Sequence, residues 1–398
     1  MQPSSITQEE LDALIRRIFS IIDITFGTRE QGFLVRYRGK LIGEDSSKAY
    51  DQISDALKPH ALLPLFRKEK DNQSIIIAPE LPKPKVSNPR INLILFILTF
   101  FSVVLAGILY VGGNALPSNL SEFLVALQTG GFPYAISLIA ILGTHEFGDF
   151  LAGRYHKVNV TLPYFIPMPF GFGTMGAFIN MKGFVKNRNH LLDIGIAGPL
   201  SGFVVATIVL IIGLRISAID AIPTSFPAGS GIQIEGNSLY YLFLKFITLG
   251  QLLPQPASIG GSPFLYWLQY FFTSRPAPLG GMDVMLSPVA WAGWAGLLVT
   301  ALNLIPAGTL DGGHIFQVLF GKEKARKAMP FIAIALIILG FVWSGWWLWV
   351  VLVFFFGRIY AEPLDQITPL DKNRRILGIV SIAVFILTFV PVPLSLIF

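Results

Sequence analysis

Three ionisable side chains lie within five residues of one another in an otherwise apolar segment, GTHEFGDFLAGR at Gly143–Arg154. His145 and Asp149 are four residues apart, so on a helix they share a face and can direct donor atoms at one ion. Glu146 lies beside them and is placed to polarise a water molecule. This arrangement follows the logic of helical HExxH zinc motifs, in which two ligands share a face and a glutamate acts as general base. The structural alternative is that the three residues only cap a helix end.

A fourth candidate belongs to a later apolar segment, which ends in the sequence NLIPAGTLDGGHIF. Asp311 in this sequence is a candidate third ligand, because a charged group within hydrocarbon costs about 2.5–3.5 kcal/mol and persists there for function. The alternative is turn chemistry, since Asp-Gly-Gly is a common turn sequence. Whether Asp311 can meet His145 depends on the elements that carry the two residues.

The composition indicates that these segments lie in a membrane. The chain has 398 residues, of which 53% are hydrophobic and only 14% are charged. Its first 90 residues hold 12 acidic and 14 basic residues, as in a soluble domain, whereas the other 308 hold only 12 and 16. The absence of cysteine excludes disulfides, thiolate ligands and thiol nucleophiles. The high share of hydrophobic residues excludes disorder as the main interpretation. Nucleic-acid binding is excluded as well, because the net charge of +6 comes mostly from membrane-flanking residues.

Residues 1–78 predict a small cytoplasmic α+β domain with a ferredoxin-like topology. Its expected elements are a capped helix from Thr7, strands at 21–25 and 33–37, a helix over 47–57, and a hairpin formed by LPLFRKE and QSIIIAP. Residues 79–90 contain four prolines and are expected to form a stiff linker, after which residues 91–398 form a transmembrane domain.

Six apolar runs after the linker are long enough to cross a bilayer. They are residues 91–113, 131–152, 191–214, 287–305, 329–357 and 376–389. The fifth run is interrupted at Ser344-Gly345 among four tryptophans that indicate an interfacial belt, so we interpret it as a helical hairpin, with one long tilted helix as the alternative. The predicted fold class is therefore a polytopic α-helical membrane protein of about six to seven spans with a small cytoplasmic N-terminal α+β domain.

The distribution of Lys and Arg predicts the orientation of these spans. With the N-terminus in the cytoplasm, thirteen basic residues flank the inner ends of the spans and three lie outside, a strong positive-inside pattern. This orientation brings the end of the second span, with His145, and the end of the fourth span, with Asp311, to the same cytoplasmic depth. The common depth favours a ligand role for Asp311 over a turn.

Taken together, the motifs resemble the site-2 protease family of intramembrane zinc metalloproteases, in its cyanobacterial and plastid branch. The resemblance covers residues 85–398 and rests on His145-Glu146-x-x-Asp149, Asn303-x-x-Pro306, Leu310-Asp311-Gly312, the segment Pro163–Gly183 and Gly195-x-Ala197-Gly198-Pro199. It implies one zinc ion held by His145, Asp149 and Asp311. It also implies that Glu146 polarises the attacking water, and that Asn303 steers the substrate or supports the oxyanion.

One ligand position departs from the family, which has histidine where this chain has Asp149. A carboxylate oxygen does bind zinc, so a site of one histidine and two carboxylates is chemically allowed. Aspartate is shorter than histidine, and its charge lessens the positive charge with which the ion acidifies water. We therefore expect weak zinc occupancy and low activity.

Further residues beside the site have two interpretations each. The stretch Gly171–Gly183, which contains Gly173-Thr174-Met175-Gly176-Ala177-Phe178, could form an extended edge that binds an unwound substrate through main-chain hydrogen bonds, or a purely structural re-entrant loop. Gly173, Thr174, Met175 and Gly176 are the candidate substrate-binding residues. Three glycines of the third span, at positions 195, 198 and 202, are expected to permit close helix packing. His314 is expected on a cytoplasmic loop surface, with a place beside Asp311 as the alternative.

The function implied is an intramembrane endopeptidase that cleaves transmembrane helices of other proteins, as in regulated intramembrane proteolysis. The alternative is a catalytically inactive pseudoprotease that acts as a membrane binding or chaperone-like scaffold; an ion transporter is disfavoured because no inverted repeat is visible. The expected partners are a transmembrane protein substrate and the lipid bilayer, with no nucleic acid. The expected location is the cell membrane or thylakoid membrane of a bacterium of cyanobacterial type, because the first residues show no transit-like leader.

Overall fold

The N-terminal α+β unit forms where short apolar patterns alternate with turns. The computed structural model describes residues 6–28, 31–69, 71–80, 87–227, 231–357 and 359–397, so part of the expected linker lies outside the described residues. The elements of the unit are α1 (Gln8–Arg16), β1 (Phe19–Phe26), β2 (Val35–Leu41), α2 (Ser46–Leu57), β3 (Leu62–Lys68) and β4 (Gln73–Pro79). A capping box between Thr7 and Glu10 begins α1.

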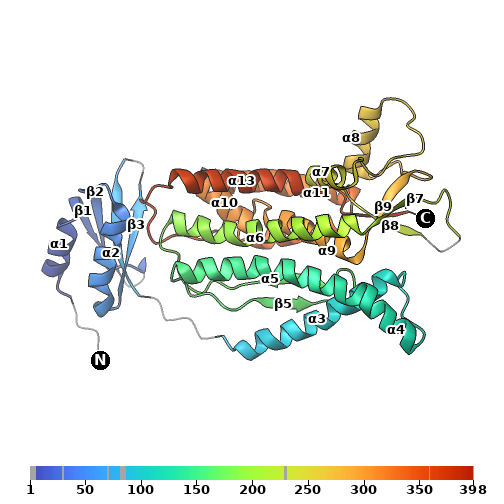
Figure 1. The fold of residues 1–398 in the computed structure, drawn as a ribbon. Coiled ribbons are helices and arrows are strands. Elements are labelled where there is room, and N and C mark those ends of the chain that lie inside the picture. Colours follow the sequence, from blue (N-terminus) through green and yellow to red (C-terminus); the bar gives the residue numbers. More distant parts are fainter. Residues whose placement is uncertain are drawn as a thin grey trace.

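The four strands make one antiparallel sheet in the order β1-β2-β4-β3. Placing β4 between β2 and β3 gives the split βαβ arrangement of ferredoxin-like sheets, here with α1 and β1 at the start of the chain. Apolar side chains of both helices and the inner sheet face, including Ile15, Tyr37, Ile53 and Phe66, form a separate buried core. This unit lies at one end of the molecule, and β3 is the last strand of its sheet (Figure 1).

The rest of the chain is an elongated layer of helices that run side by side away from this unit (Figure 1). Among the described residues, four helical segments are long and apolar enough to cross a membrane, namely α3 (Pro89–Val111), Leu120–Tyr155, α6 (Arg188–Arg215) and α11 (Lys322–Val342). The second comprises α4 (Leu120–Ala126), a π-helical turn and α5 (Phe132–Tyr155). The two other predicted spans correspond to the shorter helices α9 (Pro288–Asn303) and α13 (Lys372–Thr388).

The predicted break near Ser344 is present between α11 and α12 (Trp346–Phe356). Gly340 of α11 lies against Trp347, and Met329 near the start of α11 lies against Gly357 after α12, so the second helix returns along the first. Trp346 differs from the expected interfacial belt, because it is 1% exposed and its indole N–H donates to the Pro391 carbonyl oxygen at 2.7 Å. This tryptophan is part of the core.

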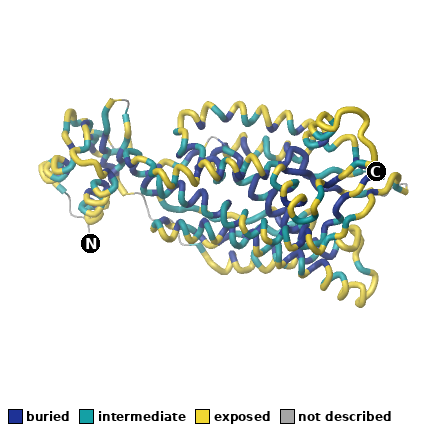
Figure 2. The backbone as a smooth tube through the Cα atoms, turned by 45° about the horizontal axis from the view of Figure 1, so that its top comes forward, coloured by how far each residue is buried: buried dark blue, intermediate teal, exposed yellow. Residues whose placement is uncertain are grey.

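The central helices are α5, α6 and α9, and they pack directly on one another. Figure 2 shows buried backbone concentrated along the middle of the helical layer, with exposed stretches on the outward faces. Those outward faces carry large apolar side chains such as Phe101, Ile208, Phe331 and Ile379, which are more than half exposed. An apolar surface of this kind is typical of helices that contact lipid.

A short antiparallel hairpin, β5 (Tyr164–Pro167) and β6 (Thr174–Phe178), lies among the helices beside α3 and α5. At the end of the molecule away from the N-terminal unit, two further ribbons form (Figure 1). They pair β7 (Ala218–Ala221) with β9 (Met282–Met285) and β8 (Ile232–Glu235) with β10 (Leu394–Ile397). The helices α7 (Leu239–Leu249) and α8 (Pro263–Thr273) join them there, and α10 (Asp311–Phe320) follows α9 at the other end.

A group of buried charges lies at the far end, around α7. Lys245 is fully buried, and its Nζ is 4.3 Å from the centre of the Tyr241 ring. The Tyr241 hydroxyl donates to Glu235 Oε1 at 2.9 Å. Asp283 of β9 is 3% exposed and accepts the N–H of Val284 at 2.8 Å. This outer cluster, which comprises Glu235, Tyr241, Lys245 and Asp283, therefore places one lysine near two carboxyl groups.

Candidate active site

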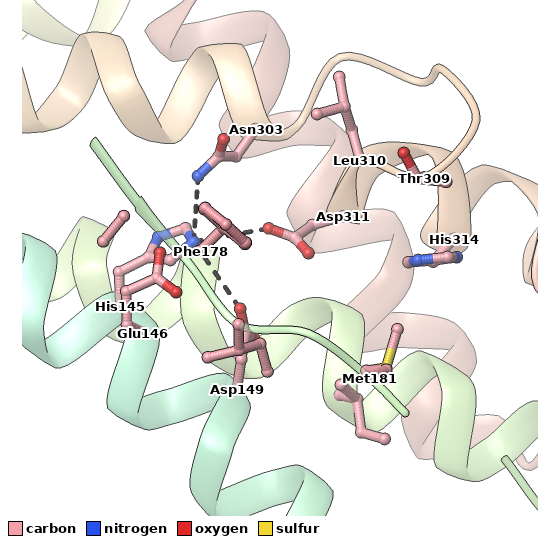
Figure 3. A pocket seen from close by; sticks show the side chains of 13 residues that line it. His145, Glu146, Asp149, Phe178, Met181, Asn303, Thr309, Leu310, Asp311 and His314 are labelled. Atoms are coloured by element: carbon pink, nitrogen blue, oxygen red, sulfur yellow. Dashed lines mark hydrogen bonds and ion pairs between the residues drawn. The ribbon is translucent and has the colours of Figure 1, made fainter. Parts of the chain in front are cut away.

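The predicted ligand residues come together where α5 passes the start of α10. One donor atom from each of His145, Asp149 and Asp311 lies within 4.8 Å of the other two. His145 Nε2 is 3.8 Å from Asp149 Oδ2 and 3.5 Å from Asp311 Oδ2. His145 and Asp149 are 3% and 5% exposed. The three side chains converge from α5 and α10, as Figure 3 shows.

The donors fit a divalent metal ion. Zinc bonds of about 2.0–2.1 Å place neighbouring donors of a tetrahedral site about 3.3 Å apart, slightly closer than the two distances to His145 Nε2. One imidazole and two carboxylates are all zinc ligands, and the two negative charges balance a divalent cation. The geometry therefore satisfies the first requirements of a metal site: ligand type, ligand number and separation.

Glycines of α6 make the room that the α5 side chains occupy. A Cβ atom added to Gly198 would lie 2.6 Å from the carboxylate carbon of Asp149, and one added to Gly202 would lie 3.1 Å from His145 Nδ1. The N–H of Gly198 donates to Asp149 Oδ1 at 2.7 Å, next to Pro199, which interrupts the helical hydrogen bonds of α6. This bond leaves Asp149 Oδ2 facing His145.

Asp311 is the first residue of α10, directly after the Pro306–Leu310 turn. A carboxylate at a helix N-terminus is stabilised by the helix dipole. Gly195 of α6 brings α10 close, since a Cβ there would be 3.3 Å from His314 Cβ and 3.5 Å from the Asp311 carbonyl oxygen. The three glycines therefore allow close packing, as expected, and they do so at the site: Gly198 and Gly202 leave room for Asp149 and His145, and Gly195 leaves room for α10.

Glu146 and Asn303 lie on opposite sides of the donors and line the same cavity of about 150 Å³. Glu146 is 4% exposed and makes no ion pair within the described residues. The Asn303 side-chain nitrogen lies 3.1 Å from His145 Nε2, at the end of α9 (Figure 3). The cavity thus gathers a carboxylate placed for proton transfer and an amide placed beside the donors.

The segment from the end of β6 to Met181 closes one side of this cavity. Ala177, Phe178, Ile179 and Met181 line it, and Phe178 lies across the donors in Figure 3. The predicted substrate-binding stretch Gly173–Gly176 lies earlier on the same strand and does not line this cavity within the described residues. Thr174 is buried with its hydroxyl bonded to the Ile166 carbonyl oxygen at 2.8 Å. The stretch alternates poorly in the sequence, so its pattern could not separate the residues that line the cavity from the rest of the strand.

One histidine lies where the sequence interpretation did not place it. His314 was expected on a loop surface, but it is 4% exposed on α10 and lines the cavity. His156 lies outside this cavity, bonds Asp193 at 2.8 Å and stacks on the ring of His190 at 4.0 Å between centroids. The position of His314, three residues after Asp311, was the signal that could have located it, because such residues share a helix face.

Comparisons with known proteins bear on the identity of this site. The family model described as "Peptidase family M50" matches residues 133–343, a range that contains every donor, Glu146 and Asn303. The curated protein "Probable zinc metalloprotease EGY2, chloroplastic" of Arabidopsis thaliana is 27% identical over 98% of this chain and 66% of its own length. "Probable zinc metalloprotease EGY1, chloroplastic" of Oryza sativa subsp. japonica is 32% identical over 76% of this chain and 50% of its own length.

This chain therefore spans about half to two thirds of the length of these relatives. No solved structure matches it. The family model covers more than half of the chain, and the predicted motifs fall inside the matched range. The expectation of a metalloprotease by family is thereby confirmed, and the chain belongs to peptidase family M50, the site-2 proteases.

Proposed function

We propose that the chain is an intramembrane zinc endopeptidase that cleaves membrane-spanning segments of other proteins near the cytoplasmic side. One observation carries this proposal: three metal-binding side chains and a buried glutamate converge on one cavity inside a layer of apolar helices. The names of the relatives as zinc metalloproteases support the choice of metal. The expected partners are a transmembrane protein and lipid.

His145, Asp149 and Asp311 would hold the zinc ion, which when bound supplies Lewis-acid polarisation of the scissile carbonyl and activation of water. Glu146 takes the proton of the attacking water and returns it to the leaving amide nitrogen, as a general base and then a general acid. Asn303 directs its amide towards the region of the donors, where it can donate to the substrate carbonyl as negative charge develops.

The free side of β6 suggests how a substrate binds. Within the described residues β6 pairs only with β5, and the N–H and C=O of Gly176 are bonded to the Thr174 hydroxyl. The other edge of β6 can therefore take a further strand once the Thr174 hydroxyl releases Gly176. An unwound substrate added there would run past Gly173–Gly176 towards the cavity, bound by main-chain hydrogen bonds that tolerate many sequences. The present cavity of about 150 Å³ is small for a peptide, so β6 must shift when substrate enters.

The topology of the proposed enzyme follows from the positive-inside pattern. We place residues 1–78 in the cytoplasm, residues 79–90 as the linker and residues 91–398 in a membrane of bacterial or plastid type, crossing it six to seven times. Asp311 begins α10, which lies on the side of the helical layer nearer the N-terminal unit (Figure 1), and this supports chemistry on the cytoplasmic side.

Asp149 favours the second candidate, a pseudoprotease scaffold, because the resemblance leads us to expect histidine there. The Gly198 N–H, however, holds the carboxylate with one oxygen towards His145, which is the orientation a ligand needs. We therefore expect a site that binds zinc more weakly than an imidazole-containing site, by about tenfold or more, and retains proteolysis in proportion to occupancy.

The test measures zinc per chain and cleavage of a single-span reporter in proteoliposomes, for the parent chain and for Asp149→His. Zinc content and cleavage should both rise in the variant, and a chelator should remove both from either protein. Equal, full occupancy and activity in the parent would show that the carboxylate is a fully competent ligand. Absence of zinc and of cleavage in both proteins would overturn the enzyme and favour the scaffold.

A further inference from the structure

The edge strand β3 of the N-terminal sheet is not free, because the connection between α12 and α13 is hydrogen-bonded to it. The N–H of Phe66 donates to the Leu364 carbonyl oxygen at 2.9 Å, and the N–H of Gln366 donates to the Phe66 carbonyl oxygen at 3.0 Å. Phe66 and Asp365 form an isolated parallel bridge. Leu364 and Ile367 also pack against the core of the N-terminal unit. The segment 363–368 is thus bound to the edge of the N-terminal sheet around Asp365.

The same segment also binds the chain just before α6. The N–H of Leu364 donates to the Val185 carbonyl oxygen at 2.9 Å, and the N–H of Asp365 donates to the Lys186 carbonyl oxygen at 2.7 Å. Asn187 and Asp365 form an isolated parallel bridge. Segment 363–368 therefore links the N-terminal sheet to residues 185–187 through main-chain hydrogen bonds to both.

Residues 185–187 are the point from which both sides of the candidate site are held. Four residues before Val185 lies Met181, which lines the cavity together with the end of β6. Directly after them, Asn187 caps α6 by accepting the N–H of His190 at 3.0 Å. That helix carries Gly198, whose N–H orients Asp149. Residues 185–187 therefore connect directly, along the chain, to the cavity-lining segment that follows β6 and to α6, which orients Asp149.

Side-chain hydrogen bonds also hold segment 363–368 and residue Lys186 against α2. Asp365 is 0% exposed, and its carboxylate accepts the N–H groups of Ile367 at 2.8 Å and Thr368 at 3.1 Å, as well as the Thr368 hydroxyl. That hydroxyl lies 2.8 Å from the Ser46 hydroxyl at the start of α2. On the other flank, the Lys186 ammonium donates to Asp51 of α2 at 2.7 Å. Asp365 is the residue that shapes the bound segment.

We propose that the N-terminal unit is a clamp that positions the substrate-binding strand, with Asp365 as its central positioning residue. Docking of segment 363–368 fixes residues 185–187, and these in turn limit how far the chain from Ala177 to Met181 can move away from the donors. The clamp rests on the proposed proteolytic function for its effect on cleavage, whereas its effect on strand mobility is independent of that function.

The experiment compares the full-length parent with Asp365→Ala, and with Asp365→Asn, which keeps one acceptor oxygen for the two N–H groups. Amide hydrogen exchange should become at least about tenfold faster across residues 177–187 in Asp365→Ala, and stay unchanged in α9. Cleavage of the single-span reporter should fall on the order of tenfold, mainly through a higher KM, with zinc content unchanged. Asp365→Asn should restore most of both readouts, and Asp55→Ala on the exposed face of α2 is the matched control.

A disulfide offers a direct rescue, because the chain has no cysteine of its own. The hydroxyl oxygens of Ser46 and Thr368 are 2.8 Å apart, so cysteines at both positions need only a small adjustment to bond. In a chain that also carries Asp365→Ala, oxidation of this pair should slow the exchange of residues 177–187 and recover cleavage. Reduction should reverse both effects, which a folding defect would not do.

Each outcome has a defined meaning. Unchanged exchange across residues 177–187 in Asp365→Ala would overturn the clamp, whatever happens to cleavage. Failure of the oxidised pair to slow that exchange would overturn it as well. If the parent itself binds no zinc and cuts no reporter, the proposed function fails, while the exchange measurements still decide the clamp.

Discussion

Two clusters of buried charge lie at opposite ends of the helical layer, and they are built on different principles. The donors His145, Asp149 and Asp311 place their atoms within 4.8 Å of one another around a common centre, and no lysine or arginine of the described residues makes an ion pair with them. The outer cluster has two carboxylates as well, but it adds Lys245 and the Tyr241 hydroxyl. The donors leave two carboxylates for a ligand, whereas in the outer cluster one lysine offsets part of the charge of two carboxylates.

The difference shows which feature marks a reactive site. Burial does not separate the two clusters, because Asp149 is 5% exposed and Asp283 is 3% exposed. A cavity borders both, of about 150 Å³ at the donors and about 510 Å³ beside Glu235 and Asp283. Convergence of lone pairs on one point, without a protein cation, is therefore the discriminating property.

The largest expected effect separates the clusters by chemistry. Glu146→Gln should lower cleavage of the reporter about 10²- to 10⁴-fold and leave zinc content nearly unchanged, because this residue moves a proton and does not hold the ion. Glu235→Gln is the matched replacement at the far end, and it should keep cleavage within about twofold. Loss of zinc in Glu146→Gln, in step with cleavage, would instead make Glu146 a ligand.

The second prediction concerns the space around the donors. Gly198→Ala places a methyl group 2.6 Å from the Asp149 carboxylate carbon, so the carboxylate must move away from His145. Zinc affinity should fall about 10- to 100-fold, measured by competition with a chelator of known affinity. Gly143→Ala in α5 has nothing within 4 Å of the added atom and is the control, with zinc affinity unchanged. Equal affinities in the two variants would show that Gly198 is only a packing residue.

A double-mutant cycle tests whether Lys245 and Asp283 of the outer cluster stabilise each other. Lys245→Met should destabilise the protein by leaving Asp283 without a nearby positive charge, and Lys245→Met with Asp283→Asn should recover much of that loss. The expected coupling is about 0.5–3 kcal/mol, measured by thermal or denaturant unfolding in detergent. Additive effects would indicate that the two charges do not stabilise each other. Cleavage per folded molecule should not change in any of these variants.

The smallest expected effect is a pH dependence of stability from the outer cluster. Burial and the neighbouring Asp283 raise the pKa of Glu235 from 4.5 to about 7. A carboxyl with a raised folded-state pKa stabilises the fold while protonated, so its contribution is full below pH 4.5 and is lost as pH rises towards 7. The melting temperature should fall by roughly 1–3 °C over this range, and Glu235→Gln should flatten the profile. If the melting temperature of the variant still fell with pH as in the parent, a group other than Glu235 would cause the pH dependence.

The sequence predicted most of what local pattern and charge placement determine. The α+β unit, the apolar helices and the break near Ser344 follow from periodicity, composition and turn residues, and the structure agrees. The common depth of His145 and Asp311 followed from counting basic residues, and the distances between their side chains agree with it. Lengths were less predictable, since α9 has only 16 residues, because helix ends depend on packing.

Contacts between distant parts of the chain could not be predicted from pattern. The burial of Trp346 depends on a hydrogen bond to Pro391, and the lining of the cavity by Phe178 depends on the register of a two-stranded hairpin. The pairing of Phe66 with Asp365 joins residues almost 300 positions apart. Neither hydrophobic period nor composition carries information about such partners, because any free strand edge offers the same main-chain groups.

The glycine face of α6 has a consequence for how this protein tolerates sequence change. Three positions on one helix, Gly195, Gly198 and Gly202, face the donors or the helix that carries one of them, so side chains there are limited by volume. A saturation scan for proteolysis should rank Gly198 with Glu146, although glycine has no reactive group. Lineages that vary α6 should therefore keep small residues there longest, and a lineage that has lost proteolysis should be free to fill them.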